Sequence, residues 1–278
     1  MSWRSVLRPL VRAIEWSRVH RVLVAPLLLL LWRSRSRPMH PVRIVPLAWG
    51  RGISIVIPER GGGEMLARCL DSLAAARRHV DEPTEVIVIV NGSAREDYAA
   101  MAARHPDLIW QFHERPLGFT QAVIHGIALA KFGGVYLLNN DMILAPQALS
   151  ALLPVRAPYV FGIASEIEFE GERRREETGW TRMRVEDDLP NPYHEPPEGP
   201  VLRGTVWAGA GSALFPRDLL AKLMPGSLVF DPFYWEDVDL GLRAWRMGYD
   251  SVVCPSSKVV HGHRVTVRRF YAEAKVQR

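Results

Sequence analysis

Carboxylates and histidines that could share one reaction cleft lie close together near the C-terminal end of the chain. Glu236, Asp237 and Asp239 open a segment with helical apolar spacing that Gly248 can end, and a short apolar run then leads to the His-Gly-His sequence at 261–263. A carboxylate at a helix start can remove a proton from a substrate, and a histidine at a strand end can bind a metal ion. The alternative is that Asp237 only caps the helix, which contributes about 0.5–2 kcal/mol.

A second acidic group follows a different apolar run. Val135–Leu138 leads directly into Asn139, Asn140 and Asp141. In open α/β sheets, ligands bind beyond the carboxyl ends of the strands, and oxygen ligands there suit a hard divalent cation that also contacts diphosphate. Taken alone, these residues can equally form a plain turn, since Asn and Asp tolerate left-handed backbone.

The elements that must position these groups alternate between strand and helix. The apolar patterns predict strands at 53–57, 85–90, 108–112 and 135–138, and helices at about 64–79 and 120–131. Such alternation predicts an α/β fold with a mostly parallel sheet and right-handed crossovers. Ser93 and Glu96 have the spacing of a capping box for a further helix.

Beyond Asp141 the pattern changes. We expect a helix near 147–153, a proline-rich loop at 189–200 and a strand with small residues at 206–215. The glycines at 61–63 lack the Lys-Ser/Thr of a P-loop and predict a flexible connection from strand to helix. The sequence contains no Gly-x-Ser-x-Gly motif, which disfavours a hydrolase.

Charge divides the chain into an arm and a domain. The 278-residue chain has a net charge of +5, but residues 1–50 hold nine arginines and one glutamate, a balance of +8 that leaves −3 for the rest. A mildly acidic remainder is not the pattern of a nucleic-acid-binding domain. Cys69 and Cys254 lie in apolar contexts and indicate buried thiols in a reducing compartment. We expect one domain at 51–264 and a basic tail at 265–278.

The N-terminal arm suits a membrane surface. Residues 3–14 combine apolar helical spacing with an arginine face, and residues 22–32 form an apolar run that contains Pro26. A spanning helix needs about 20 apolar residues, so the run predicts an interfacial anchor on an anionic leaflet. Two alternatives stay open: the run packs on the domain as an extra helix, or the region is a targeting segment. The proline-containing stretch 34–50 predicts a linker.

Seven segments occur in an order that is typical of one enzyme family. They are ISIVIP at 53–58, CLDSL at 69–73, EVIVIVNGS at 85–93, LGF at 117–119, LLNND at 137–141, WAGAGSALFPRDLL at 207–220 and FYWEDVDLGLRAWRMGY at 233–249. Together they resemble the family 2 glycosyltransferases, nucleotide-sugar enzymes of the GT-A fold. The resemblance covers about residues 52–264, and its specificity comes from the ordered set.

The resemblance implies a role for each residue of the site. Asp237 is implied as the catalytic base of an inverting displacement, and Asp141 as a ligand of Mg²⁺ or Mn²⁺ together with His261, with His263 as the alternative. The implied nucleotide-sugar contacts are Pro58, Glu59, Arg60, Asn91, Gly118, Asn139 and Asn140. We also expect acceptor contacts at Trp235 and Glu236, since aromatic faces pack well on apolar sugar faces. The alternative is that the aromatic residues next to this helix start belong to the core.

The chain departs from the family pattern at two positions. Asn139 replaces the first carboxylate of the metal-binding Asp-x-Asp, and Val90 replaces an aspartate that contacts the nucleobase. These departures favour one alternative, a catalytically silent GT-A-like binding protein; a nucleotidyltransferase is another. The main prediction is transfer of a sugar to a hydroxyl of a glycan or lipid-linked acceptor at the cytoplasmic face of a membrane, in cell-surface polysaccharide synthesis and without a nucleic-acid partner.

Overall fold

The structure of the protein is a computed structural model that describes residues 45–169, 178–186, 189–195, 199–232 and 234–262. Every described residue belongs to one compact unit, which begins at Ile44. The predictions for the basic arm, its apolar run and the C-terminal tail therefore lie outside the described residues. No helix within the described residues is both long and apolar enough to cross a membrane.

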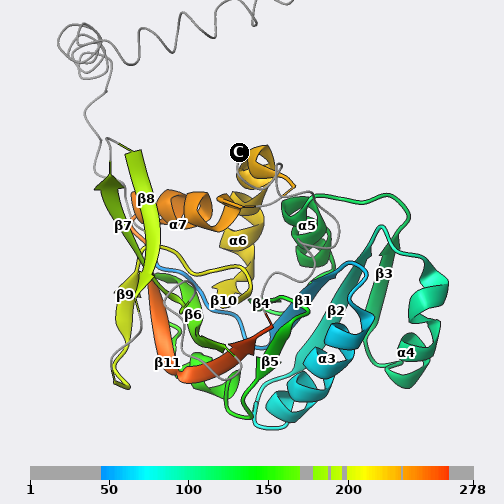
Figure 1. Cartoon of the computed structure of the whole chain (residues 1–278). Coiled ribbons are helices and arrows are strands. Elements are labelled where there is room, and N and C mark those ends of the chain that lie inside the picture. The colour runs from blue at the N-terminus through cyan, green and yellow to red at the C-terminus, as the bar shows by residue number, and fades with distance from the viewer. Residues whose placement is uncertain (1–44, 170–177, 187–188, 196–198, 233, 263–278) are drawn as a thin grey trace, which may run out of the picture. The chain divides into compact units, whose positions relative to one another are not determined.

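A nine-stranded mixed sheet forms the centre of the domain (Figure 1). In its parallel half, β1 pairs with both β2 and β4, and β2 pairs with β3. The bounds are Ile53–Glu59 for β1, Thr84–Asn91 for β2, Ile109–His113 for β3 and Gly134–Leu138 for β4. The predicted parallel strands are confirmed in this half of the sheet.

The other half of the sheet mixes strand directions. β10 lies antiparallel between β4 and β6, β11 is parallel to β6, and β5 and β9 each pair antiparallel with β11. These strands are β5 (Met142–Leu144), β6 (Val160–Phe169), β9 (Arg203–Thr205), β10 (Ser212–Pro216) and β11 (Asp250–His261). A separate antiparallel hairpin consists of β7 (Trp180–Glu186) and β8 (Leu189–Glu195).

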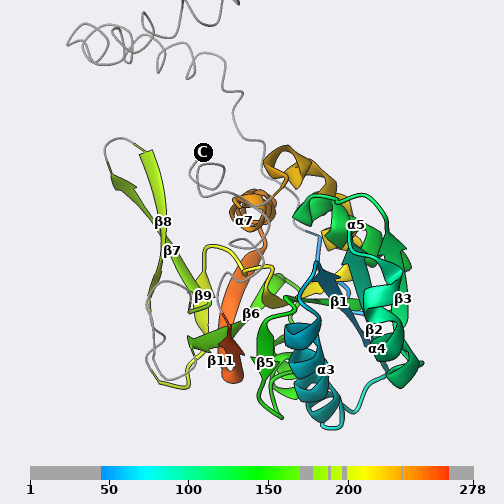
Figure 2. The same cartoon turned by 45° about the vertical axis from the view of Figure 1, so that its right-hand side comes forward.

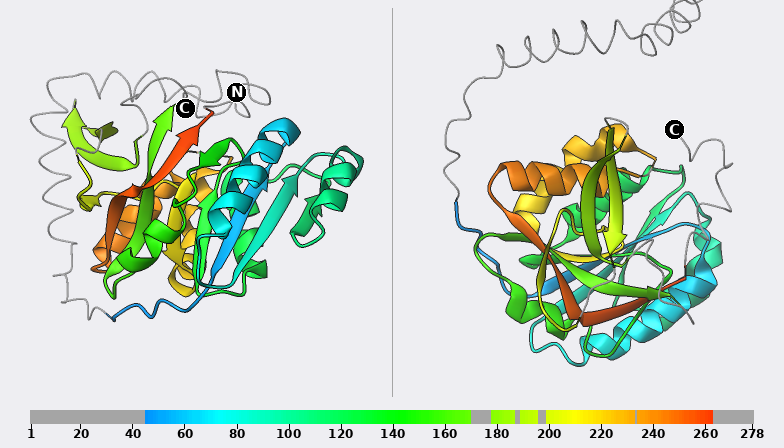
Figure 3. Two further views of the ribbon diagram at one scale, coloured as in Figure 1. Left: turned by 90° about the horizontal axis from the view of Figure 1, so that it is seen from below. Right: turned by 60° about the vertical axis from the view of Figure 1, so that its left-hand side comes forward.

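Helices cover both faces of the sheet (Figures 2 and 3). One face carries α3 (Gly63–Arg77) and the 3-10 segment η3 (Ser150–Val155). The other carries α5 (Phe119–Leu129), α6 (Arg217–Leu223) and α7 (Glu236–Arg246). The remaining described helical segments are η2 (Arg95–Tyr98), α4 (Ala99–Arg104) and η4 (Met224–Phe230).

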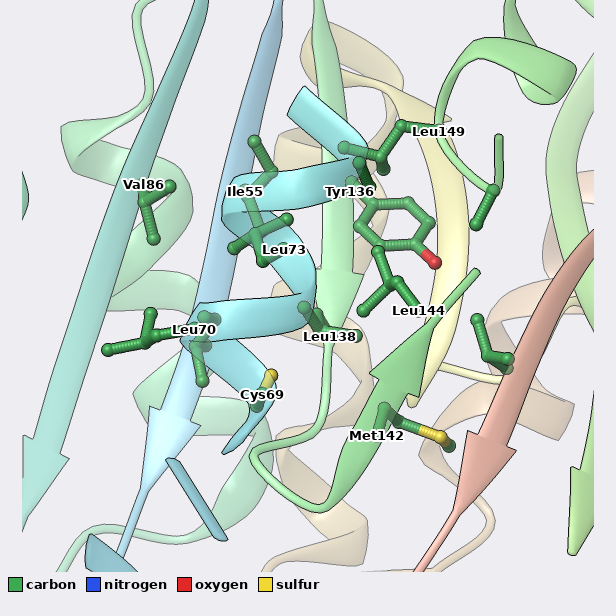
Figure 4. Packing of buried hydrophobic residues seen from close by; sticks show 14 of the residues in the cluster. Ile55, Cys69, Leu70, Leu73, Val86, Tyr136, Leu138, Met142, Leu144 and Leu149 are labelled. Carbon is green, nitrogen blue, oxygen red and sulfur yellow. The ribbon is translucent and has the colours of Figure 1, made fainter. Parts of the chain in front are cut away.

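Strand β1 shows why the predicted strands are apolar at nearly every position. Ile55 and Ile57 pack on the α3 side and Val56 packs on the α5 side, as the two-residue period of a strand requires. Figure 4 shows Leu70 and Leu73 of α3 next to Ile55. A strand that is covered on both faces has no polar side, so its sequence is a continuous apolar run.

Two predictions about helices are wrong. Ser93 and Glu96 do not form a capping box, because η2 begins without a side-chain cap and the Ser93 side chain hydrogen-bonds Tyr98 instead. The predicted helix near 147–153 is only the 3-10 segment η3. Pro154 lies inside this segment and supplies no amide hydrogen for an α-helical bond.

Two predictions for the middle of the chain also need correction. Part of the predicted proline-rich loop is strand β8, which tolerates Pro190 and Pro192 because residues two apart share one side of the hydrogen-bond ladder. The predicted strand at 206–215 is shorter, since β10 begins at Ser212 and a loop precedes it. Both cysteines are buried and free, as predicted.

Gly248 ends helix α7, as its position in the sequence predicted. Its φ is 88°, a left-handed conformation that glycine adopts without steric penalty. The amides of Gly248 and Tyr249 donate to the carbonyl groups of Trp245 and Ala244. This pair of bonds is a Schellman motif, which satisfies carbonyl groups at the helix end and starts the turn into β11.

Candidate active site

The carboxylate of Glu59 ties two loops together at the carboxyl edge of the parallel strands. It lies at the end of β1 and is 1% exposed. Its Oε1 atom accepts hydrogen bonds from the Tyr98 hydroxyl and the Gly62 amide, each at 2.6 Å, and its Oε2 atom accepts one from Asn140 Nδ2 at 2.5 Å. The glycine-rich connection after β1 is therefore held in place rather than free. Glu59 and Asn140, both predicted to contact the donor, bond each other in the interior.

Asp141 and His261 meet where β5 pairs with β11. His261 lies opposite Met142, and the Gly262 amide donates to the Asp141 carbonyl oxygen at 2.8 Å. The side chains meet as well: His261 Nε2 lies 3.2 Å from Asp141 Oδ2, and both side chains are less than a tenth exposed. The structure thus brings together the two residues that the resemblance implied as metal ligands. His263 lies outside the described residues.

The Asp141–His261 pair fits a divalent cation. Two ligands at about 2.1 Å from an octahedral metal ion and at right angles to each other lie about 3 Å apart. The separation of 3.2 Å between these two atoms is close to that value. Among the described residues, no group of three His, Cys, Asp or Glu side chains could hold a metal ion by itself. Further ligands would have to come from substrate oxygens and water, as is usual for Mg²⁺.

The small residues before β10 lie between the two halves of the site. A methyl group added at Gly211 would come within 2.9 Å of the Asn139 side-chain nitrogen, and one at Gly209 would lie 3.8 Å from Asp237 Oδ2. The Asn139 amide also donates to the Gly211 carbonyl oxygen at 2.8 Å. The backbone of this segment therefore links the end of β4 to the start of α7. Its glycines permit this close approach of the backbone.

Two adjacent carboxyl groups open helix α7. Glu236 is 8% exposed, and its Oε2 atom has no hydrogen-bond partner among the described residues. Burial, followed by the charge of Asp237, raises the pKa of Glu236 to about 8. Glu236 is therefore mostly protonated at neutral pH, and the neighbouring Asp237 is half-buried. The predicted position of Asp237 in the first turn of a helix is confirmed.

Asn91 and Gly118 shape the neighbouring loop. The Asn91 side chain accepts a hydrogen bond from the Leu117 amide at 2.5 Å and donates one to the Leu117 carbonyl oxygen at 3.0 Å. A methyl group at Gly118 would come within 2.1 Å of the Asp231 carboxyl carbon. The Asp231 Oδ1 atom accepts a hydrogen bond at 2.9 Å from the Thr120 amide in the first turn of α5. Sequence reasoning missed Asp231, because 111 residues separate these partners and no local pattern marks such a contact.

The remaining predicted contacts lie at or near the same edge. Pro58 is part of β1, Arg60 follows it, and both are half-buried. Trp235 precedes α7 and is 43% exposed, which leaves its ring accessible. Val90 is fully buried in the core. A nucleobase would therefore have to be recognised by other groups, and the individual roles of these residues stay predictions.

Two solved structures have folds similar to that of this chain. The structure of GalNAc-T7 with UDP, GalNAc and Mn²⁺ is 17% identical, with a TM-score of 0.60, over 76% of this chain and 44% of that chain. The mannosyltransferase PcManGT from Pyrobaculum calidifontis, in complex with GDP-Man and Mn²⁺, is 18% identical, with a TM-score of 0.52, over 91% of this chain and 69% of that chain. This chain thus spans less than half the length of the first. The mixed sheet with helices on both faces is a GT-A fold.

Sequence comparison gives the family. No protein with a curated description matches this chain. A family model described as glycosyltransferase like family 2 matches residues 50–275. Because this match covers most of the chain, including both carboxylate sites, the protein belongs to the family 2 glycosyltransferases.

Proposed function

We propose that this protein transfers a sugar from a nucleoside-diphosphate sugar to a hydroxyl of a glycan or lipid-linked acceptor, with inversion of the anomeric centre. The observation that carries the proposal is the position of Asp237. It is the second residue of α7 and lies beside Gly209. Gly211, at the other end of the segment 209–211, accepts a hydrogen bond from the Asn139 amide, two residues before Asp141 of the Asp141–His261 pair. A candidate base and a candidate cation site thus flank one short segment. Membership of the glycosyltransferase family supports this chemistry.

Asp237 is the proton acceptor in this proposal. As the acceptor oxygen attacks the anomeric carbon, its proton passes to the Asp237 carboxylate. Glu236 keeps its own proton at neutral pH because burial raises its pKa to about 8. The bond from the anomeric carbon to the diphosphate oxygen breaks on the face opposite to the attack. A single displacement of this kind inverts the anomeric centre.

Asp141 and His261 would hold the divalent cation of the proposed reaction. Such a cation supplies positive charge beside the departing nucleoside diphosphate. Both solved structures described above contain Mn²⁺ with a nucleotide, which supports Mn²⁺ or Mg²⁺ here. Asn139 is neutral where a second carboxylate would add a negative charge. We therefore expect the cation to bind much more tightly with the nucleoside diphosphate than without it.

The proposed location is the cytoplasmic face of a membrane, with the N-terminal arm as a peripheral anchor. The support is chemical: residues 1–50 hold nine arginines, and residues 22–32 form an apolar run too short to span a bilayer. The acceptor then belongs to a lipid-linked or cell-surface glycan.

Turnover and donor binding of an Asp237→Asn variant test the proposal. With a panel of UDP- and GDP-sugars and Mn²⁺, the unchanged chain should transfer or hydrolyse a donor, and EDTA should stop the reaction. Asp237→Asn should lose at least about 100-fold in turnover and keep the donor Kd within about threefold. Asp250→Asn, at an exposed acidic residue just beyond α7, is the matched control and should stay within about twofold.

Three outcomes contradict the proposal in different ways. Unchanged turnover of Asp237→Asn removes the base role. Donor binding without turnover in the intact chain identifies a silent binding protein. Release of pyrophosphate from a nucleoside triphosphate identifies a nucleotidyltransferase.

A further inference from the structure

Four large apolar side chains are exposed on α7 and on the adjoining segment η4. The exposed fractions are 36% for Leu242, 66% for Trp245, 42% for Leu228 and 80% for Val229. Leu242 and Trp245 belong to α7, and Leu228 and Val229 are adjacent in η4, which packs on α7. Single exposed apolar residues are normal on a protein surface, whereas several on two packed elements favour an interaction site. We call these four residues the α7–η4 face.

Hydrogen bonds hold the two parts of this face together. Arg243 donates from Nη2 to Ser227 Oγ at 2.7 Å and from Nε to Asp239 Oδ2 at 2.8 Å, and Ser227 Oγ donates to Asp239 Oδ2 at 2.9 Å. Since Ser227 belongs to η4, this network fixes η4 along the side of α7. Leu242 and Trp245 are neighbours three residues apart on the helix. In Figures 1 and 2, α7 lies on the side of the sheet opposite to α3.

The N-terminal arm joins the described chain beside the same helix. Tyr249, which follows the glycine that ends α7, donates its hydroxyl to the Val45 carbonyl oxygen at 2.8 Å. Val45 is the first described residue. The 44 residues before it contain nine arginines and the apolar run 22–32. The described chain therefore begins beside the residue that follows the C-terminal turn of α7, and a basic, partly apolar sequence precedes it.

We propose that the α7–η4 face lies against a phospholipid bilayer. A tryptophan ring favours the headgroup level of a membrane, and leucine and valine side chains suit the boundary with the acyl chains. The arginines of the attached arm, and the exposed Arg246 on α7, supply the attraction to anionic lipid that the apolar side chains lack. Four partly exposed side chains offer less than the roughly 600 Å² per partner that a stable dimer needs. A phospholipid bilayer needs only a shallow contact here, in addition to the binding by the arm, and is therefore the occupant that fits.

The contact would bring the active site close to the membrane surface. Asp237 and Trp245 are eight residues apart on α7, which is about 12 Å along the helix axis. An acceptor hydroxyl carried on a lipid headgroup would then lie near Asp237. This last consequence rests on the proposed function, whereas the bilayer contact itself does not.

Vesicle binding by the full chain tests the proposal. A Leu242→Ser, Trp245→Ser double variant is compared with the unchanged chain and with Leu129→Ser, which replaces a leucine of α5 that is 40% exposed. On vesicles of phosphatidylcholine and phosphatidylglycerol, the double variant should partition at least about tenfold more weakly, and Leu129→Ser should stay within about twofold. Trp245→Phe should retain most of the binding. Thermal unfolding checks that each variant is folded at the temperature of the assay. All variants should turn over soluble donor equally, so a failed function would be seen separately.

Equal partition of the double variant and the unchanged chain overturns the proposal. Tighter partition of the double variant also overturns it, because that result is expected if residues 22–32 cover the face and the substitutions release them. A lower oligomeric state in light scattering, without a change in partition, would assign the face to a second copy of the chain instead.

Discussion

The buried carboxyl group of Glu236 should make the stability of the domain depend on pH in a defined direction. Burial, with smaller contributions from the charges of Asp237 and Asp231, raises its pKa from 4.5 to about 8. In the unfolded chain the same group ionises near the lower value. Between the two values the folded state binds the additional proton. The free energy of unfolding therefore falls as the pH rises through this window, and levels off above about pH 8.

The size of the change in unfolding free energy follows from the shift in the pKa of Glu236. Each unit of pKa difference corresponds to about 1.4 kcal/mol, which sets an upper limit of about 5 kcal/mol for this group. Water reaches part of the side chain, and local rearrangement relieves some of the penalty, so we expect about 2–4 kcal/mol. Glu236→Gln keeps the size and polarity of the side chain but cannot ionise. The variant should lose the pH dependence that this one carboxyl group contributes.

Urea unfolding at pH 5 and pH 9 measures this contribution. The unchanged chain should lose about 2–4 kcal/mol more stability between these pH values than Glu236→Gln does. Glu96→Gln, at an exposed position in η2, should behave like the unchanged chain and controls for the loss of a carboxyl group as such. If all three proteins lose the same stability within about 0.5 kcal/mol, Glu236 is not protonated in the folded state at neutral pH.

Three further substitutions test single contacts. Tyr98→Phe removes a donor to the buried Glu59 and should lower the unfolding free energy in urea by about 1.5–3 kcal/mol; a loss below about 0.5 kcal/mol contradicts the network. Gly118→Ala should destabilise by about 1–3 kcal/mol because its methyl group would meet a carboxyl carbon at 2.1 Å, whereas Gly63→Ala, in open space, should be neutral or stabilising; equal effects argue against the close approach. His261→Ala should weaken Mn²⁺ binding in the presence of a nucleoside diphosphate at least about tenfold by electron paramagnetic resonance, and unchanged binding removes it from the metal site.

The parallel half of the sheet was predictable because each strand is buried on both faces. A strand such as β1 then has no polar position, and its apolar run ends where the chain reaches the carboxyl edge at Glu59. The antiparallel half carries weaker signals. Strand β8 contains two prolines, and β10 follows a glycine-rich loop, so local pattern alone favours an irregular structure at both places.

The residues of the site also differ in how far the sequence predicts their positions. Asp237 stands at the start of a strongly periodic helix, so its position could be predicted from local spacing. The partnership of Asp141 with His261 came from the family resemblance, because no spacing along the chain encodes the pairing of β5 with β11. The contact of Glu59 with Asn140 joins residues 81 apart and was not predictable for the same reason. Contacts between loops depend on the finished sheet, which brings the strand ends to one edge.

Trp235 combines a left-handed backbone with an accessible ring, and these two properties can be tested apart. Its φ of 74° places a non-glycine residue in a conformation that costs about 1–3 kcal/mol. Such a conformation persists only when the surroundings impose it. Here α7 begins at the next residue, and on the other side the Pro232 carbonyl oxygen accepts a hydrogen bond from the Phe119 amide at 2.8 Å. Defined contacts at Pro232 and at the start of α7 thus flank Trp235.

Trp235→Gly and Trp235→Ala remove the same ring, but only glycine relieves the backbone. The free energy of unfolding of the glycine variant should therefore be about 1 kcal/mol higher than that of the alanine variant. If the ring packs on the acceptor, both variants should raise the acceptor KM by a similar factor while the donor Kd stays the same. Equal stability would show that the backbone of Trp235 is not strained. An unchanged acceptor KM in both variants would leave the ring without a role in the reaction, whatever their stabilities.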